Sequence, residues 1–233
     1  MSTATATPGI DTRATPVRMA ASSHAAKYAV ELVGTFILVF TVVAAVLVNA
    51  ALAPLAIGVV IAALVYAGGH VSGGHYNPAI SLAVLVRGRL APADAVAYWI
   101  AQIVGGVLGA LLARWVIDPP SVATRTLSGH VLAAALVAEL LFTFALCYVV
   151  VNVATSRDHT VNSFYGMAIG FIVLAGAVAV GGVSGGQFNP AVALGVDTVG
   201  IFAWSAIWVY LLAQVLGGIL AGLAFRALIP ADK

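Results

Sequence analysis

Four long stretches of this chain contain no Asp, Glu, Lys or Arg, and this feature constrains the fold more than any other. The stretches cover residues 32–86, 95–113, 159–196 and 198–225. A helix needs about 20 apolar residues to cross a bilayer, so these stretches are long enough to enter a membrane. Only 8% of the 233 residues are charged, whereas soluble domains carry roughly 25%. The chain has too little charge to cover a water-exposed surface, and we expect an integral membrane protein.

Pro, Gly and Asn residues divide the apolar sequence into pieces of two lengths. Six pieces are long enough to span a membrane, at about 28–50, 54–71, 93–116, 130–153, 161–181 and 201–227. Two others, 77–87 and 189–197, are too short to cross, and each begins with Asn-Pro-Ala. Such short helices enter a membrane only where protein or water shields their ends. The expected fold class is an all-α membrane protein with six transmembrane helices and two re-entrant half-helices.

An internal repeat relates the two short segments. The sequence VSGGHYNPAISLAV at 71–84 matches VSGGQFNPAVALGV at 183–196 at nine of fourteen positions. The same offset of 112 residues aligns 101–117 with 213–229, where eight of seventeen positions are identical. Each copy contains three full spans, and because three is odd the copies insert in opposite orientations. An inverted repeat of this kind is expected to place its site near the bilayer midplane, at the discontinuous helices.

The two Asn-Pro-Ala motifs are well suited to begin a helix. They are Asn77-Pro78-Ala79 and Asn189-Pro190-Ala191. Asn is a favoured N-cap residue and Pro is favoured at the first helical position. Inverted symmetry would bring the positive ends of the two half-helix dipoles together in the middle of the membrane, with the two Asn amides facing the space between them. Such a site repels cations and interrupts a proton-conducting chain of water.

At these residues the chain resembles the major intrinsic proteins, the family of aquaporins and aquaglyceroporins. The resemblance covers about residues 28–229 and rests on the doubled motif together with Glu31, Glu139, Gln102 and Gln214. It implies a passive pore for water or small neutral solutes in each subunit, usually within a homotetramer, and it implies no cofactor. The chain would then be a channel domain over 26–230, with repeats at about 28–117 and 136–229, behind a disordered tail at 1–25.

Three ionisable residues are candidates for roles beside the motifs. Glu31 and Glu139 lie near membrane depth, where ionisable groups are costly and point to function. A proton relay is one reading. The resemblance implies another, in which each carboxylate braces the loop before a half-helix by accepting hydrogen bonds from its backbone. His75, two residues before Asn77, is expected to line the cytoplasmic half of the pore.

The resemblance also points to four residues as the selectivity filter. Family members commonly carry an Arg directly after the second Asn-Pro-Ala, where this chain has Val192. The spacing from the motifs places the other filter positions at Ile57, Ala177 and Gly186. Without the Arg we expect a wider and more apolar opening. The substrate range therefore stays open between water and solutes such as ammonia, hydrogen peroxide, urea or glycerol.

Other functional classes are less favoured. An inverted-repeat secondary transporter would need a coupling-ion site, and no opposed acid–base pair appears within a span. A structural junction protein would have no need of two polar Asn residues in an apolar chain. We find no nucleophile–base pair or metal-ligand cluster that would indicate an enzyme, and the net charge of +2 does not indicate a nucleic-acid partner.

The distribution of basic residues predicts the orientation in the bilayer. With six spans, eight of the ten Lys and Arg residues fall on the side of both termini. The remaining two, Arg114 and Arg125, fall on the other side. Basic residues favour the cytoplasmic side, so both termini are expected in the cytoplasm and the protein in the cell membrane.

Overall fold

The computed structural model describes residues 22–159 and 162–232, and its regular structure is helical. The α-helices are α1 (His24–Leu47), α2 (Ala53–Ser72), α3 (Pro78–Arg87), α4 (Pro92–Ile117), α5 (Gly129–Thr155), α6 (Tyr165–Ser184), α7 (Pro190–Thr198) and α8 (Ile207–Leu228). Short 3-10 turns, Arg157–His159 and Trp204–Ala206, precede α6 and α8. Six of these helices are long and apolar enough to cross a membrane, while α3 and α7 are not. The predicted fold class is confirmed.

The helix ends differ from the predicted ones by a few residues, and local hydrogen bonds explain the differences. The first helix begins at His24 rather than near residue 28 because the Ser23 hydroxyl accepts from the Ala26 amide at 3.1 Å. α6 begins at Tyr165 rather than 161, where Asn162 Oδ1 accepts from the Tyr165 amide. Most of the predicted tail, residues 1–21, lies outside the described residues.

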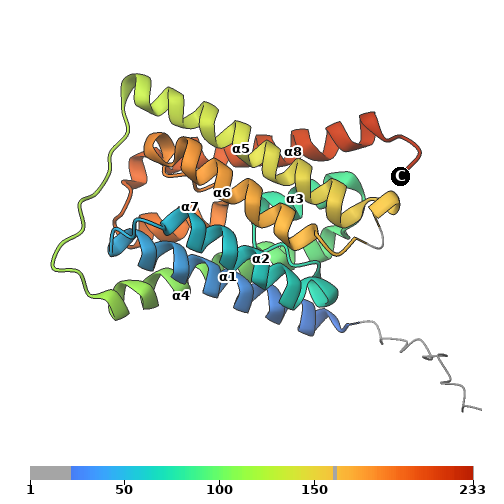
Figure 1. Ribbon diagram of the computed structural model, residues 1–233, viewed down its shortest axis with the longest axis horizontal. Coiled ribbons are helices and arrows are strands. Elements are labelled where there is room, and N and C mark those ends of the chain that lie inside the picture. Colours follow the sequence, from blue (N-terminus) through green and yellow to red (C-terminus); the bar gives the residue numbers. More distant parts are fainter. Residues whose placement is uncertain (1–21, 160–161, 233) are drawn as a thin grey trace, which may run out of the picture.

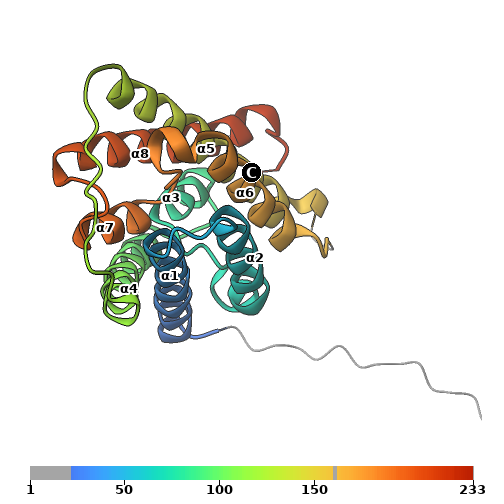
Figure 2. The same ribbon diagram turned by 60° about the vertical axis from the view of Figure 1, so that its left-hand side comes forward.

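Each half of the chain forms one side of the bundle. Helices α1, α2 and α4 lie together, α5, α6 and α8 lie together, and α3 is seen between the two groups (Figures 1 and 2). Small residues allow the closest approaches within each half. A Cβ on Gly105 or Gly109 of α4 would collide with backbone carbonyls of α1, and one on Gly217 of α8 would collide with α5. Packing of small residues is the usual way in which helices associate in lipid.

Each half-helix also contacts the opposite half of the molecule. Helix α3 packs on α8, and α7 packs on α4. At these contacts an added Cβ on Gly218 would lie 2.6 Å from the Ala79 carbonyl, and one on Gly106 would lie 2.8 Å from the Ala191 carbonyl. The half-helices therefore interlock the two repeats, as an inverted repeat requires.

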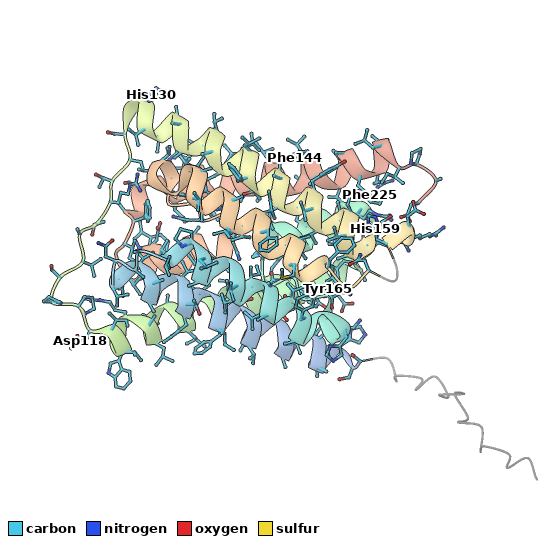
Figure 3. The ribbon with its side chains drawn as sticks, viewed as in Figure 1. Asp118, His130, Phe144, His159, Tyr165 and Phe225 are labelled. Atoms are coloured by element: carbon cyan, nitrogen blue, oxygen red, sulfur yellow. The ribbon has the colours of Figure 1, made fainter. Side chains whose placement is uncertain are left out.

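The bundle has two distinct ends. We call the end where α1 begins and α8 finishes the terminal end, and the end where residues 119–128 join α4 to α5 the loop end. Asp118 and His130 flank that connection at the loop end, and His159 lies at the terminal end (Figure 3). The start of α7 and the start of α3 lie between these ends, and this is where the functional residues gather.

Candidate functional site

The loops that lead into the two half-helices have the same backbone conformation. Three residues of each loop have positive φ angles, at 91°, 63° and 49° for Gly73, Gly74 and Tyr76 and at 93°, 63° and 51° for Gly185, Gly186 and Phe188. Glycine adopts such angles at little cost, whereas a bulky side chain does so only when its surroundings hold it there. The repeated Ser-Gly-Gly sequence is therefore a requirement of the loop geometry.

Packing holds the two aromatic residues in this unfavourable conformation. The Tyr76 ring lies against Gly34 and Gly68, and its hydroxyl donates to the Leu64 carbonyl at 2.9 Å. The Phe188 ring lies against Gly176 in the corresponding place. Both rings are 1% exposed. Each ring anchors its loop in the helical frame directly before the Asn-Pro-Ala motif.

A buried carboxylate supports each loop through four hydrogen bonds. The donors to Glu31 are the Ser72 hydroxyl, the His75 and Tyr76 amides and Gln102 Nε2, at 2.6–2.9 Å. The donors to Glu139 are the Ser184 hydroxyl, the Gln187 and Phe188 amides and Gln214 Nε2, at 2.7–3.0 Å. Both carboxylates are fully buried and neither lines a cavity described below. These contacts fit the bracing role better than a proton relay.

The two motif asparagines join the half-helices to each other. Asn77 Oδ1 accepts from the Ala79 amide at 2.8 Å, and Asn189 Oδ1 accepts from the Ala191 amide at 2.9 Å, so each caps its own helix. Their amide nitrogens cross to the other loop: Asn77 Nδ2 donates to the Phe188 carbonyl and Asn189 Nδ2 to the Tyr76 carbonyl, both at 2.9 Å.

These crossed hydrogen bonds differ from the expectation that both asparagine amides face the space between the half-helices with all their donors free. A side-chain amide carries two N–H donors, and one donor of each asparagine is committed to a protein carbonyl. One N–H of Asn77 and one of Asn189 remain for a bound molecule. Both residues line the cavity at the loop end.

A cavity of about 720 Å³ opens at the terminal end. Its lining includes His75 and the charged residues Lys27, Arg89, Asp94 and Arg157. His75 Nδ1 lies 3.0 Å from the Ser81 hydroxyl, and its ring stands edge-on to Tyr98 with centroids 5.3 Å apart. The structure thus places His75 where the cavity approaches the first motif.

A smaller cavity of about 70 Å³ lies on the loop-end side of the two asparagines. All four predicted filter residues line it: Ile57 from α2, Ala177 from α6, Gly186 from the loop and Val192 from α7. The space can hold several waters, since one water needs roughly 10–15 Å³ by this measure. Most of the lining is apolar and none of the described lining residues is charged. The role of these four residues as a filter stays a prediction.

Three residues at or near this cavity were not predicted as site residues from the sequence. Gln187 and Phe202 line it. Arg125, from the loop between α4 and α5, pairs with the backbone on either side of Phe202, and its guanidinium lies 5.6 Å from the Phe202 ring centroid. Arg125 Nη2 also donates to the carbonyls of Gly182 and Val183 at 2.5 and 2.8 Å. The repeat could have indicated Gln187, because it corresponds to His75, whereas no local pattern indicates the contacts of Arg125.

Among residues 22–159 and 162–232 no group of three His, Cys, Asp or Glu side chains could hold a metal ion. The polar groups that the structure places at the site are hydrogen-bond donors, carbonyl oxygens and two helix N-termini. Such groups bind and orient small polar molecules.

Comparisons with known proteins agree with this geometry. A family model described as "Major intrinsic protein" matches residues 18–225. The chain is 37% identical over 213 residues to "Probable aquaporin TIP4-1" of Oryza sativa subsp. japonica, covering 85% of this chain and 84% of the rice protein. It is 35% identical over 212 residues to "Glycerol uptake facilitator protein-like 6" of Lactiplantibacillus plantarum, covering 87% and 97%. The solved aquaglyceroporin from Plasmodium falciparum superposes with a TM-score of 0.76 at 21% identity, covering 90% and 99%.

Proposed function

Because this chain belongs to the major intrinsic protein family, we propose that it is a passive membrane channel for water and small neutral solutes. The observation that carries the proposal is the junction of the two half-helices. Asn77 and Asn189 cap helices of opposite orientation, bond across to each other's loops and lie between a cavity from each end of the bundle. A path that joins these two cavities past the asparagines would allow solutes to move down their gradients without a coupled step.

The same junction supports exclusion of ions. The N-termini of α3 and α7 direct positive dipole ends at the narrow region, and each asparagine retains one N–H donor. A water molecule held there presents its oxygen to both asparagines and cannot pass a proton along a hydrogen-bonded chain. No charged side chain among the described lining residues of the loop-end cavity offsets this positive field.

The substrate range follows from the loop-end cavity. One relative is named an aquaporin and another a glycerol uptake facilitator. In this chain Val192, Ile57, Ala177 and Gly186 present small or aliphatic surfaces to the cavity. A lining of this kind imposes weaker demands on solute shape and hydrogen bonding than an arginine would. We therefore extend the proposed range beyond water to ammonia, hydrogen peroxide, urea or glycerol.

The alternative, an ion- or proton-coupled transporter, is not favoured. A coupled transporter needs a coupling-ion site near the midplane, and an ionisable side chain there would be a candidate for that site. The two buried carboxylates beside the motifs, Glu31 and Glu139, already accept four protein hydrogen bonds each. Their contacts commit them to holding the loops.

Stopped-flow measurements on proteoliposomes test the proposal. Vesicles containing the purified protein should shrink or swell faster than protein-free vesicles under gradients of water and of each neutral solute. The flux should be unchanged by an imposed proton or sodium gradient. A flux that follows either ion gradient would identify a coupled transporter instead.

The proposed assembly is a homotetramer in the cell membrane with both termini in the cytoplasm. Six apolar helices make the chain an integral membrane protein. Large apolar side chains remain exposed along the outer faces of the bundle, including Val137 and Leu141 of α5 at 61% and 57%, which suits contact with lipid or with other subunits.

Native mass spectrometry would test the oligomer. Labelling of cysteines placed at His159 and at Thr124 in the Cys147→Ser background would test the orientation.

A further inference from the structure

The side chain of one glutamine at the loop-end cavity has no hydrogen-bond partner among the described residues. Gln187 is one of the residues that line this cavity and is 7% exposed as a whole, while its Oε1 and Nε2 are buried and have no hydrogen-bond partner among the described residues. Its backbone is fixed, because its amide donates to Glu139 Oε1 at 2.9 Å. A buried polar group without a partner destabilises the folded protein, so a native protein that keeps one calls for an explanation.

The repeat shows why the side chain lacks a partner. Gln187 corresponds to His75 at the offset of 112 residues. In the first repeat the Ser81 hydroxyl lies 3.0 Å from His75 Nδ1 and accepts from Gln102 Nε2 at 2.9 Å. The residue that corresponds to Ser81 is Ala193, which has no hydroxyl. The second repeat therefore keeps the polar side chain but has lost the group that would bind it.

Few other side chains can bind a polar molecule in this cavity. Apart from Gln187, the polar side chains among its described lining residues are Asn77 and Asn189. Each asparagine uses its oxygen as a helix cap and one N–H on the opposite loop. The asparagines thus offer donors only. The Gln187 amide can offer both a donor and an acceptor.

We infer that the Gln187 side chain is a specificity-determining residue that hydrogen-bonds the permeating solute in the loop-end half of the channel. The inference rests on the proposed channel function. A solute that leaves water for an apolar cavity needs replacement hydrogen bonds, and Val192 supplies none. The amide of Gln187 provides them to small neutral molecules that carry both donor and acceptor groups, of which water and urea are the probes.

The experiment compares Gln187→Met with the wild type and with a matched control in reconstituted vesicles. Methionine keeps the length of the side chain and removes both polar atoms. The control, Leu141→Met, introduces methionine on the exposed outer face of α5, away from both cavities. For Gln187→Met we expect water and urea permeability per incorporated protein to fall about three- to tenfold, the effect of roughly one lost hydrogen bond, and the activation energy of water flux to rise. Leu141→Met should match the wild type in both measurements.

Thermal stability in detergent separates solute binding from a structural role. Because Gln187 has no protein partner for its side chain, Gln187→Met should melt at or above the temperature of the wild type. A merely structural glutamine would instead lower the melting temperature and the number of active channels, leaving the activation energy per channel unchanged. That result would overturn the inference.

A second variant supplies the missing partner. Ala193→Ser places a hydroxyl at the position that Ser81 occupies in the first repeat, and it should capture the Gln187 amide and reduce water and urea flux. Wild-type flux in both Gln187→Met and Ala193→Ser would contradict the inference and leave the channel function intact. A wild-type protein that conducts neither water nor urea would instead contradict the proposed function.

Discussion

Individual side chains, rather than the helical frame, distinguish the two halves of the proposed pathway. The two halves of the helical frame match closely: the loops before the half-helices have nearly the same φ angles, and Glu31 and Glu139 accept hydrogen bonds from corresponding donors. Several residues that face the cavities do not repeat. His75 has a hydroxyl partner while Gln187 has none. Predictions at the residue scale therefore concern which side chains reach the pathway and which only hold it.

Thiol chemistry tests the position of Val192. The free cysteine of the described chain, Cys147, is fully buried and is not among the lining residues of either cavity. Water flux of the wild type should therefore be nearly insensitive to a mercurial. Val192→Cys places a thiol on the loop-end cavity, and a mercurial should block most of its flux. The Cys147→Ser background is the control, and strong block of the wild type that disappears in Cys147→Ser would show that Cys147 faces the pathway.

The two bracing carboxylates should be equivalent in their contribution to stability. Glu31→Gln and Glu139→Gln each bring an amide NH₂ against N–H donors and remove charge-assisted hydrogen bonds, which contribute roughly 1.5–3 kcal/mol each. Both variants should melt several degrees below the wild type, and by similar amounts because the donors to the two residues match. A scan of melting temperature in detergent measures this. A large loss in one variant with none in the other would contradict the symmetrical bracing.

At the scale of elements, the half-helices depend on asparagine for two separate tasks. Asn77 caps α3 with its oxygen and holds the opposite loop with its nitrogen. Aspartate caps a helix as well as asparagine does, so Asn77→Asp should keep α3 intact. It would, however, set a carboxylate oxygen against the Phe188 carbonyl and place a negative charge at the junction.

We therefore expect Asn77→Asp to conduct less water and to leak cations. Water flux and potassium flux in the same vesicles measure the two effects, and Asn189→Asp should behave alike because its bond to the Tyr76 carbonyl is equivalent. Neutral flux at the wild-type level without cation leak, in both variants, would remove the half-helix junction from the proposed mechanism.

The elements that sequence predicts best are those whose signal is local. Long apolar pieces between Pro, Gly and Asn residues predicted the six spans, and the Asn-Pro-Ala repeats predicted both half-helices to within a residue. Helix ends were less accurate, since the start of α6 depends on a single hydrogen bond that the Tyr165 amide donates to Asn162 Oδ1. The unpartnered state of the Gln187 side chain depends on Ala193, six residues later, which has no hydroxyl. The position of Arg125 depends on backbone hydrogen bonds with residues 201 and 203. Those features involve contacts that no local pattern contains.

At the scale of the whole molecule, one carboxylate ties the two repeats together at the terminal end. Asp232 follows the last helix of the second repeat. Its Oδ1 lies 2.8 Å from Arg87 Nη2 and 2.9 Å from Arg89 Nη2, both at the end of α3. Its Oδ2 accepts from the Arg157 amide between α5 and α6 at 2.8 Å. Arg87 is 2% exposed and lies 4.0 Å from the Phe225 ring centroid, so its charge depends on this partner.

These contacts predict how the stability of the protein depends on pH. The Arg157 amide, and then Arg87 and Arg89, hold the pKa of the Asp232 carboxyl well below its usual value of about 3.9. A carboxyl whose pKa is lowered by folding stabilises the protein at every pH above its unfolded pKa, and that contribution is lost as the pH falls toward the folded pKa.

Asp232→Asn removes the charge at all pH values and leaves Arg87 buried without its partner. It should therefore melt a few degrees below the wild type between pH 5 and 8, and the difference should shrink steadily below pH 4. The control is Asp158→Asn, which changes an exposed carboxylate at the same end and should melt with the wild type. A difference between Asp232→Asn and the wild type that stays constant down to pH 2, or that is absent at pH 7, would show that the Asp232 contacts do not join the repeats in the folded protein.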